Sequence, residues 1–228
     1  QNTLPVTLEE MLHHAKAVSR GARTPFLIGD LPFLSYHGTA EDAVLAAGRF
    51  LKEAGMDAVK LEGGTERVPA IEAMVKSGIP VMGHLGLTPQ KIHQLGGFKP
   101  QATTAEAART LLLEAKRLEE AGIFSLVLES VPAEVAEVVT NALAIPTIGI
   151  GAGVNCDGQV LVWHDLLGLD EDFCPPFAKS YRQLGRAIVE GLQEYRAEVK
   201  DRSFPAAAQT RQMAPTELLE FENRVKAC

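Results

Sequence analysis

The chain has 228 residues, of which 46% are hydrophobic and 22% are charged, and its formal net charge is −7. That length is ample for one domain with a full hydrophobic core. The acidic balance argues against nucleic acid as a partner, because no stripe of Lys and Arg is available to neutralise phosphates.

Three cysteines, an odd number without ligand-like spacing, support neither a disulfide framework nor a zinc site and favour a reducing compartment. No apolar run approaches the ~20 residues needed to cross a bilayer, so no membrane partner is expected. The segment from Gln1 to Val6 has neither the basic end nor the apolar stretch of a secretory signal. These features together predict a cytoplasmic protein.

Helical and strand patterns alternate along the chain. The predicted elements are, in order, a helix over 7–20, a strand over 26–29, a helix over 39–55, a strand over 58–61, a helix over 66–77, a strand over 81–84, a helix from 88, a helix over 103–121, a strand over 125–128, a helix over 132–143, strands over 147–150 and 160–163, and a helix over 179–200. Thr7 and Thr103 each open a capping box, and Thr88 with Pro89 supplies an N-cap followed by proline.

Strands that are apolar on both faces and separated by helices indicate a parallel sheet covered by helices. Either a (β/α) barrel or an open doubly wound sheet satisfies the pattern. A dinucleotide-binding fold is disfavoured, because no helix pattern directly follows the glycine-rich stretch 149–153, which we interpret as a tight loop at a barrel rim. After Ser203 the composition changes to Ala, Gln and Pro. We therefore predict a catalytic barrel domain over 1–202 and a linker with a short C-terminal helix over 203–228.

Ionisable residues end several of the apolar runs. Lys60 and Glu62 are two residues apart at the end of one strand, so their side chains point to the same side. Taken alone, this pair has a second interpretation, as a structural ion pair or a strand that ends in solvent. Asp30, His84 and Glu129 end three further apolar runs. Four strand ends that direct ionisable groups to one place predict an active site.

Six segments of the chain closely resemble ketopantoate hydroxymethyltransferase, in order and in spacing. The eight-residue block Gly83–Gln90 is the most specific of them, and the match runs from about Thr3 to the helix after Lys179. The other five segments are 30–33, 59–64, 128–132, 148–153 and 176–179.

The resemblance implies a (β/α)8 TIM barrel of the phosphoenolpyruvate mutase-like group. It also implies transfer of a hydroxymethyl group from 5,10-methylenetetrahydrofolate to 3-methyl-2-oxobutanoate, giving 2-dehydropantoate, in the first committed step towards pantothenate. Members of the family are homo-oligomers that assemble into decamers. The family begins with about two further βα units, the second of which ends in an Asp-Ser pair that contacts metal and keto acid. The resemblance therefore implies a barrel shortened at its N-terminus to about six βα units.

By the same resemblance, Asp30 and Glu62 bind Mg²⁺, directly or through water, and Asp30, Lys60 and His84 contact the substrate. Glu129 takes the position of the general base. Hard carboxylate oxygens suit Mg²⁺, and a divalent metal would stabilise the enolate that forms when the proton beside the carbonyl is removed. Burial at a strand end should raise the pKa of Glu129, which improves it as a base.

For two of these residues an alternative interpretation stays open. In the alternative interpretation, His84 is a core histidine with satisfied hydrogen bonds. Glu129 is then an acid that stabilises a helix N-terminus. Two other functions also stay open: a related Mg²⁺-dependent carbon–carbon lyase, and an inactive shortened form with a structural or assembly role.

Overall fold

The structure, a computed structural model, describes residues 2–227. These residues form two compact units, divided between Leu161 and Val162, and we describe each by itself. The first unit contains a parallel sheet in the strand order β1-β2-β3-β4-β5-β6, so each strand pairs with its neighbour in sequence. The strands are β1 (Ile28–Asp30), β2 (Ala58–Lys60), β3 (Val81–Gly86), β4 (Ser125–Glu129), β5 (Thr147–Ile150) and β6 (Gly158–Gln159). The predicted α/β fold with about six βα units is thereby confirmed.

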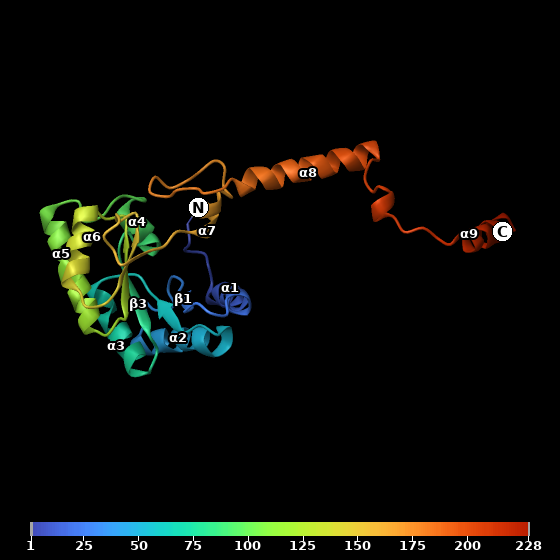
Figure 1. Cartoon of the computed structure of the whole chain (residues 1–228). Helices are drawn as coiled ribbons and strands as arrows, with labels where there is room; N and C mark the ends of the chain where they lie inside the picture. Colours follow the sequence, from blue (N-terminus) through green and yellow to red (C-terminus); the bar gives the residue numbers. More distant parts are fainter. Residues whose placement is uncertain (1, 228) are drawn as a thin grey trace. The chain divides into compact units, whose positions relative to one another are not determined.

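Helices connect the strands and surround the sheet (Figure 1). They are α1 (Leu8–Gly21), α2 (Ala40–Ala54), α3 (Val68–Lys76), α4 (Ile92–Leu95), α5 (Ala105–Glu120) and α6 (Ala133–Ala142), with short 3₁₀ helices η1 (Thr65–Arg67) and η2 (Pro89–Lys91). Thr7 begins α1 with the predicted capping box, and Thr39 begins α2 with a second one. The connections therefore follow the βα pattern that the sequence predicts.

Three local predictions are wrong. Thr104 rather than Thr103 caps α5, because its hydroxyl accepts the N–H of Ala107. Thr88 makes no side-chain capping hydrogen bond, and a 3₁₀ turn rather than an α-helix follows it. The strand predicted over 160–163 lies earlier, as β6, and helix α7 (Trp163–Leu167) begins where that strand was expected to end. A short apolar run does not distinguish a strand from a buried helix by periodicity alone, and pairing with β5 sets the position of β6.

Two apolar clusters lie on the two faces of the sheet. The larger one fills the space between the sheet and the helices and includes Phe50, Ile71 and Leu126, each of them fully buried. The smaller one contains Met82, Val127 and Ile150. Side chains alternate along a strand, so this smaller cluster shares its face with residues two positions further along the strands. Those further positions are where the predicted site residues lie.

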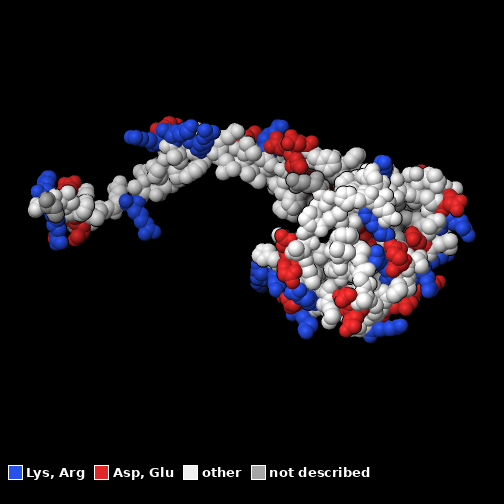
Figure 2. Space-filling view, turned by 180° about the vertical axis from the view of Figure 1, so that it is seen from behind, with Lys and Arg blue, Asp and Glu red and all other residues white. Residues whose placement is uncertain are grey.

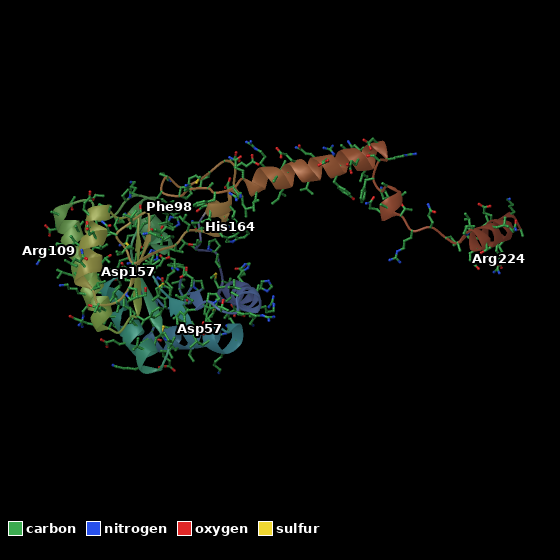
Figure 3. All side chains as sticks on the ribbon, in the orientation of Figure 1. Asp57, Phe98, Arg109, Asp157, His164 and Arg224 are labelled. Atoms are coloured by element: carbon green, nitrogen blue, oxygen red, sulfur yellow. The ribbon has the colours of Figure 1, made fainter. Side chains whose placement is uncertain are left out.

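The opposite, amino end of the sheet uses ionisable residues differently. The carboxylate of Asp57 accepts the backbone N–H of Leu27 at 2.8 Å, and that of Asp157 accepts the N–H of Thr147 at 2.8 Å. Both aspartates are labelled in Figure 3. They satisfy backbone groups where strands enter the sheet, a structural role.

The second unit contains α7, α8 (Leu184–Asp201), η3 (Ala207–Gln209) and α9 (Pro215–Lys226). The helix predicted over 179–200 begins five residues later than expected, and α9 forms at the position predicted for the C-terminal helix. The division at residue 202 stays a prediction. Among the described residues, no helix is long and apolar enough to cross a membrane.

Gly29 offers a stability test of the contact between β1 and α2. A Cβ at Gly29 would lie 2.3 Å from Cδ1 of the fully buried Phe50, so Gly29→Ala should cost about 1–3 kcal/mol by overpacking. A Cβ at Gly48, within α2, meets nothing within 4 Å, so Gly48→Ala should stabilise by about 0.5–1 kcal/mol. Urea unfolding of both variants checks the prediction, and equal stabilities would contradict it.

Candidate active site

The five residues predicted for the site come together at the carboxyl ends of the strands. Asp30, Lys60 and Glu129 are the last residues of β1, β2 and β4, Glu62 follows β2, and His84 lies within β3. Asp30 pairs in register with Lys60, which places these two side chains next to each other on one face of the sheet. The register, rather than any single motif, therefore brings the ionisable groups together.

Lys60 forms an ion pair with Asp30. Its Nζ lies 2.7 Å from Oδ1 of Asp30, and the Asp30 side chain is still 43% exposed. Burial works against the charge of Lys60, but the carboxylates of Asp30 and Glu62, and more weakly Glu129, prevail and raise its pKa. Lys60 is therefore a fixed positive charge, and Asp30 keeps part of its surface open towards a ligand.

His84 lies between two carboxylates. Its Nε2 is 3.2 Å from Oε2 of Glu129, and its Nδ1 is 3.9 Å from Oε1 of Glu62. Burial, and then the charge of Lys60, lowers the pKa of His84 to about 4, so the ring is neutral at pH 7. Neither ring nitrogen of His84 has a hydrogen-bond partner among the described residues, so His84 is not a core histidine with satisfied hydrogen bonds. A neutral imidazole has one nitrogen that donates and one that accepts, and both are available to a ligand here.

Glu129 is a largely buried carboxylate with the properties of a base. Its side chain is 14% exposed. Burial raises its pKa from 4.5 to about 7, against the opposing effect of Lys60. Most other acidic and basic side chains of the first unit lie on the surface, where they are interspersed (Figure 2). A carboxylate that titrates near pH 7 is suited to removing and returning a proton there.

Glu62 is held by residues that the sequence did not indicate. The backbone N–H of Gln90 donates to Oε2 of Glu62 at 2.9 Å, and the N–H of Glu62 donates to the hydroxyl of Tyr36 at 3.2 Å. The hydroxyl of Tyr36 in turn donates to Oε1 of Gln90 at 2.7 Å. Gln90 lay within the most specific block of the resemblance, but no pattern indicated that Gln90 or Tyr36 is buried beside Glu62.

The donor set of the site suits Mg²⁺ with only two protein carboxylates. Oε1 of Glu62 is the oxygen that Gln90 does not bind, and Asp30 is partly open. Residues 2–227 contain no group of three or more His, Cys, Asp or Glu side chains that could hold a metal. Mg²⁺ usually keeps several waters and takes one or two carboxylates together with substrate oxygens, so the pair fits this ion.

A hollow of about 550 Å³ lies between α5 and the loops that follow β2 and β3, and none of the five site residues lines it. The glycines Gly63 and Gly64, which follow Glu62, and Gly86, which pairs in register with Glu129, line it. Thr88, Gln94, Gln101, Thr110 and Glu114 contribute polar side chains. A second hollow of about 490 Å³, which none of the five residues lines, lies against α1 and α2, and we assign it no role.

The raised pKa of Glu129 predicts how stability depends on pH without metal. Between pH 4.5 and about 7 the carboxyl group of Glu129 is protonated in the folded chain but deprotonated in the unfolded chain. The free energy of unfolding therefore falls as pH rises through this range, by at most about 3 kcal/mol. Glu129→Gln should lack this fall and exceed wild type in stability above pH 7. Urea unfolding of both proteins in EDTA at pH 5 and pH 8 checks this, and the comparison cancels the opposite contribution of His84. A difference that does not change with pH would contradict the prediction.

Solved structures with a similar fold have low sequence identity. The structure of oxaloacetate acetylhydrolase in complex with 3,3-difluorooxalacetate matches with a TM-score of 0.54 and 12% identity, over 99% of this chain and 77% of that one. Phosphonopyruvate hydrolase, in its complex with oxalate and Mg²⁺, matches with a TM-score of 0.52 and 15% identity, over 99% and 78%. These likenesses establish a shared fold and nothing more about function.

Sequence comparison is more specific. The 3-methyl-2-oxobutanoate hydroxymethyltransferase of Clostridioides difficile is 53% identical over 205 residues, which are 90% of this chain and 74% of that protein. The protein of the same name in Syntrophobacter fumaroxidans is 57% identical over 204 residues, 90% and 72% of the two chains. The sequence profile of ketopantoate hydroxymethyltransferase matches residues 1–207. With this match over most of its length, the chain belongs to the ketopantoate hydroxymethyltransferase family.

Proposed function

We propose that the chain transfers a hydroxymethyl group from 5,10-methylenetetrahydrofolate to 3-methyl-2-oxobutanoate. Water is consumed, and 2-dehydropantoate and tetrahydrofolate are formed, the first committed step towards pantothenate. The observation that carries the proposal is the buried Glu129 carboxylate, whose pKa is raised to about 7, at one rim with Lys60 and His84. The names of relatives that are more than half identical to this chain support the same reaction.

Glu129 would act as the general base. It removes the proton from the carbon beside the keto group of the substrate, and the enolate carbon then forms a bond to the one-carbon unit. Both bonds from the bridging methylene carbon to the folate nitrogens break as the new carbon–carbon bond and the hydroxyl group of the product form. One nitrogen receives the proton removed from the substrate, and the other receives a proton from the water that supplies the hydroxyl. A base that titrates near the working pH exchanges a proton in both directions, which this sequence of steps requires.

Lys60, Asp30 and His84 would orient the keto acid. The ammonium of Lys60 lies where it can attract the substrate carboxylate or the enolate oxygen, while Asp30 keeps it in place. His84, which is neutral at pH 7, would hydrogen-bond to the substrate or to the new hydroxyl group.

Asp30 and Glu62 would hold Mg²⁺. When bound, the ion would act as a Lewis acid that stabilises negative charge on the keto oxygen. Beyond the site, we propose a cytoplasmic homo-oligomer, the decamer of the family, for which light scattering of the purified chain is the test.

The function is tested by incubating the purified chain with 5,10-methylenetetrahydrofolate, 3-methyl-2-oxobutanoate and Mg²⁺. We expect 2-dehydropantoate to form only when all three are present. Carbon–carbon cleavage of 2-oxo acids without the folate would instead indicate a related lyase. A chain that forms the expected oligomer but shows no turnover would support the structural or assembly role.

A further inference from the structure

Tyr36, Gln90 and Leu31 form a hydrogen-bonded unit behind the Glu62 carboxylate. The hydroxyl of Tyr36 donates to Oε1 of Gln90 at 2.7 Å, and Nε2 of Gln90 donates to the backbone oxygen of Leu31 at 2.9 Å. All three residues are buried, with Tyr36 1% exposed and Gln90 8% exposed. The unit thus joins the loop after β1 to η2, two segments that flank Glu62.

The unit contacts Glu62 at two points. The backbone N–H of Gln90 donates to Oε2 of the Glu62 carboxylate, and the backbone N–H of Glu62 donates to the Tyr36 hydroxyl. One oxygen of the carboxylate and the backbone of the same residue are therefore fixed together. The other oxygen, Oε1, is turned towards His84 and the cluster.

The unit also reaches the second proposed metal ligand. Leu31 directly follows Asp30, and its backbone N–H donates to the oxygen of Lys60 at 2.9 Å. Leu31 is thus bound on both sides of its backbone, because its oxygen accepts a hydrogen bond from the Gln90 side chain. Asp30 ends β1 and Glu62 follows β2. The distance between these two proposed ligands therefore depends on the hydrogen bonds that connect the loops after the two strands.

We infer that Tyr36 and Gln90 are positioning residues, which act as one unit to set the Glu62 carboxylate and the Asp30 loop for binding of a divalent cation. The inference rests on the proposed metal role of Glu62. Neither side chain touches the cation in this assignment. Residues that orient metal ligands from behind typically change metal affinity by about 10–100-fold when they are replaced.

The test measures Mg²⁺ binding by calorimetry on the full chain, without substrates. Tyr36→Phe and Gln90→Met keep the volume of each side chain and remove its hydrogen bonds. Each should weaken Mg²⁺ binding about tenfold. The double variant should lose less than the product of the two effects, because both substitutions break one unit. Hydroxymethyl transfer should then need more Mg²⁺ but recover at saturating Mg²⁺.

Thr140→Val is the matched control. Thr140 lies in α6, and its hydroxyl bonds to the backbone oxygen of Ala136 and to the hydroxyl of Thr147 at the amino end of β5, both at 2.8 Å. It should lower the melting temperature without changing Mg²⁺ affinity. The inference is overturned if Tyr36→Phe and Gln90→Met leave Mg²⁺ affinity unchanged, if Thr140→Val weakens it equally, or if the two effects multiply in full.

A parallel titration of Glu62→Ala separates this inference from the proposed function. Weakened Mg²⁺ binding in Glu62→Ala together with wild-type binding in Tyr36→Phe and Gln90→Met would overturn the positioning role alone. Wild-type binding in Glu62→Ala would remove the metal role of Glu62, and the positioning inference with it.

Discussion

Replacing Glu129 with glutamine is expected to reduce turnover by about 10²–10⁴-fold, the usual contribution of a general base. Glutamine keeps the shape of the side chain, so packing at the end of β4 should persist, but an amide cannot accept the substrate proton. Binding of Mg²⁺ and of 3-methyl-2-oxobutanoate should remain largely intact, because Glu129 holds neither in the proposed arrangement. Steady-state assays give the turnover, and calorimetry gives the two affinities.

The matched control for this prediction is Glu134→Gln. Glu134 is an exposed carboxylate in the first turn of α6, five residues along the chain from Glu129. The same chemical change there should leave turnover near wild type. A loss of less than about tenfold in Glu129→Gln would remove Glu129 from the role of base.

The pH profile provides a second readout of the same assignment. Because the base must be deprotonated, kcat/KM of the wild type should rise as pH increases through about 7, the pKa to which burial raises Glu129. His84, with its pKa lowered to about 4, is neutral throughout this range and should not contribute a second limb. A profile that is flat from pH 6 to pH 8 would contradict Glu129 as the titrating base.

The sequence predicted the site well because the necessary information is local. Alternation along a strand places Lys60 and Glu62 on one side, and parallel strands bring their carboxyl ends to one edge of a sheet. The structure confirms that Asp30, Lys60, Glu62, His84 and Glu129 meet there. Their catalytic and metal-binding roles stay predictions, because proximity alone does not show what a group binds.

What the sequence did not predict depends on contacts between distant segments. Tyr36 and Gln90 are 54 residues apart, and neither stands in a pattern that marks a buried polar group. Their role becomes visible only when the loop after β1 and η2 lie against Glu62. The position of β6 was wrong for a similar reason, since pairing with β5, and not the apolar run after it, determines which residues form the strand.

Asp30→Ala and Glu62→Ala are each expected to weaken Mg²⁺ binding by more than the about tenfold loss expected from residues that only orient a ligand. Each substitution removes one of the two carboxylates assigned to the ion, and water replaces a charged oxygen poorly as a partner for a hard cation. Calorimetric titration of the substrate-free chain measures both affinities, with Glu134→Ala as the exposed control.

The two variants should differ in what else they change. Asp30→Ala also removes the ion-pair partner of Lys60, whose side chain is only 19% exposed, and a largely buried ammonium without its nearest carboxylate should lower stability. Glu62→Ala leaves that ion pair in place, but the Gln90 N–H loses its acceptor. If the loss of metal affinity came only from disturbed charge balance, Lys60→Met would restore binding in the Asp30→Ala background. Unchanged Mg²⁺ affinity in both single variants would remove this pair as the metal site, because these two residues are the only protein ligands that the assignment uses.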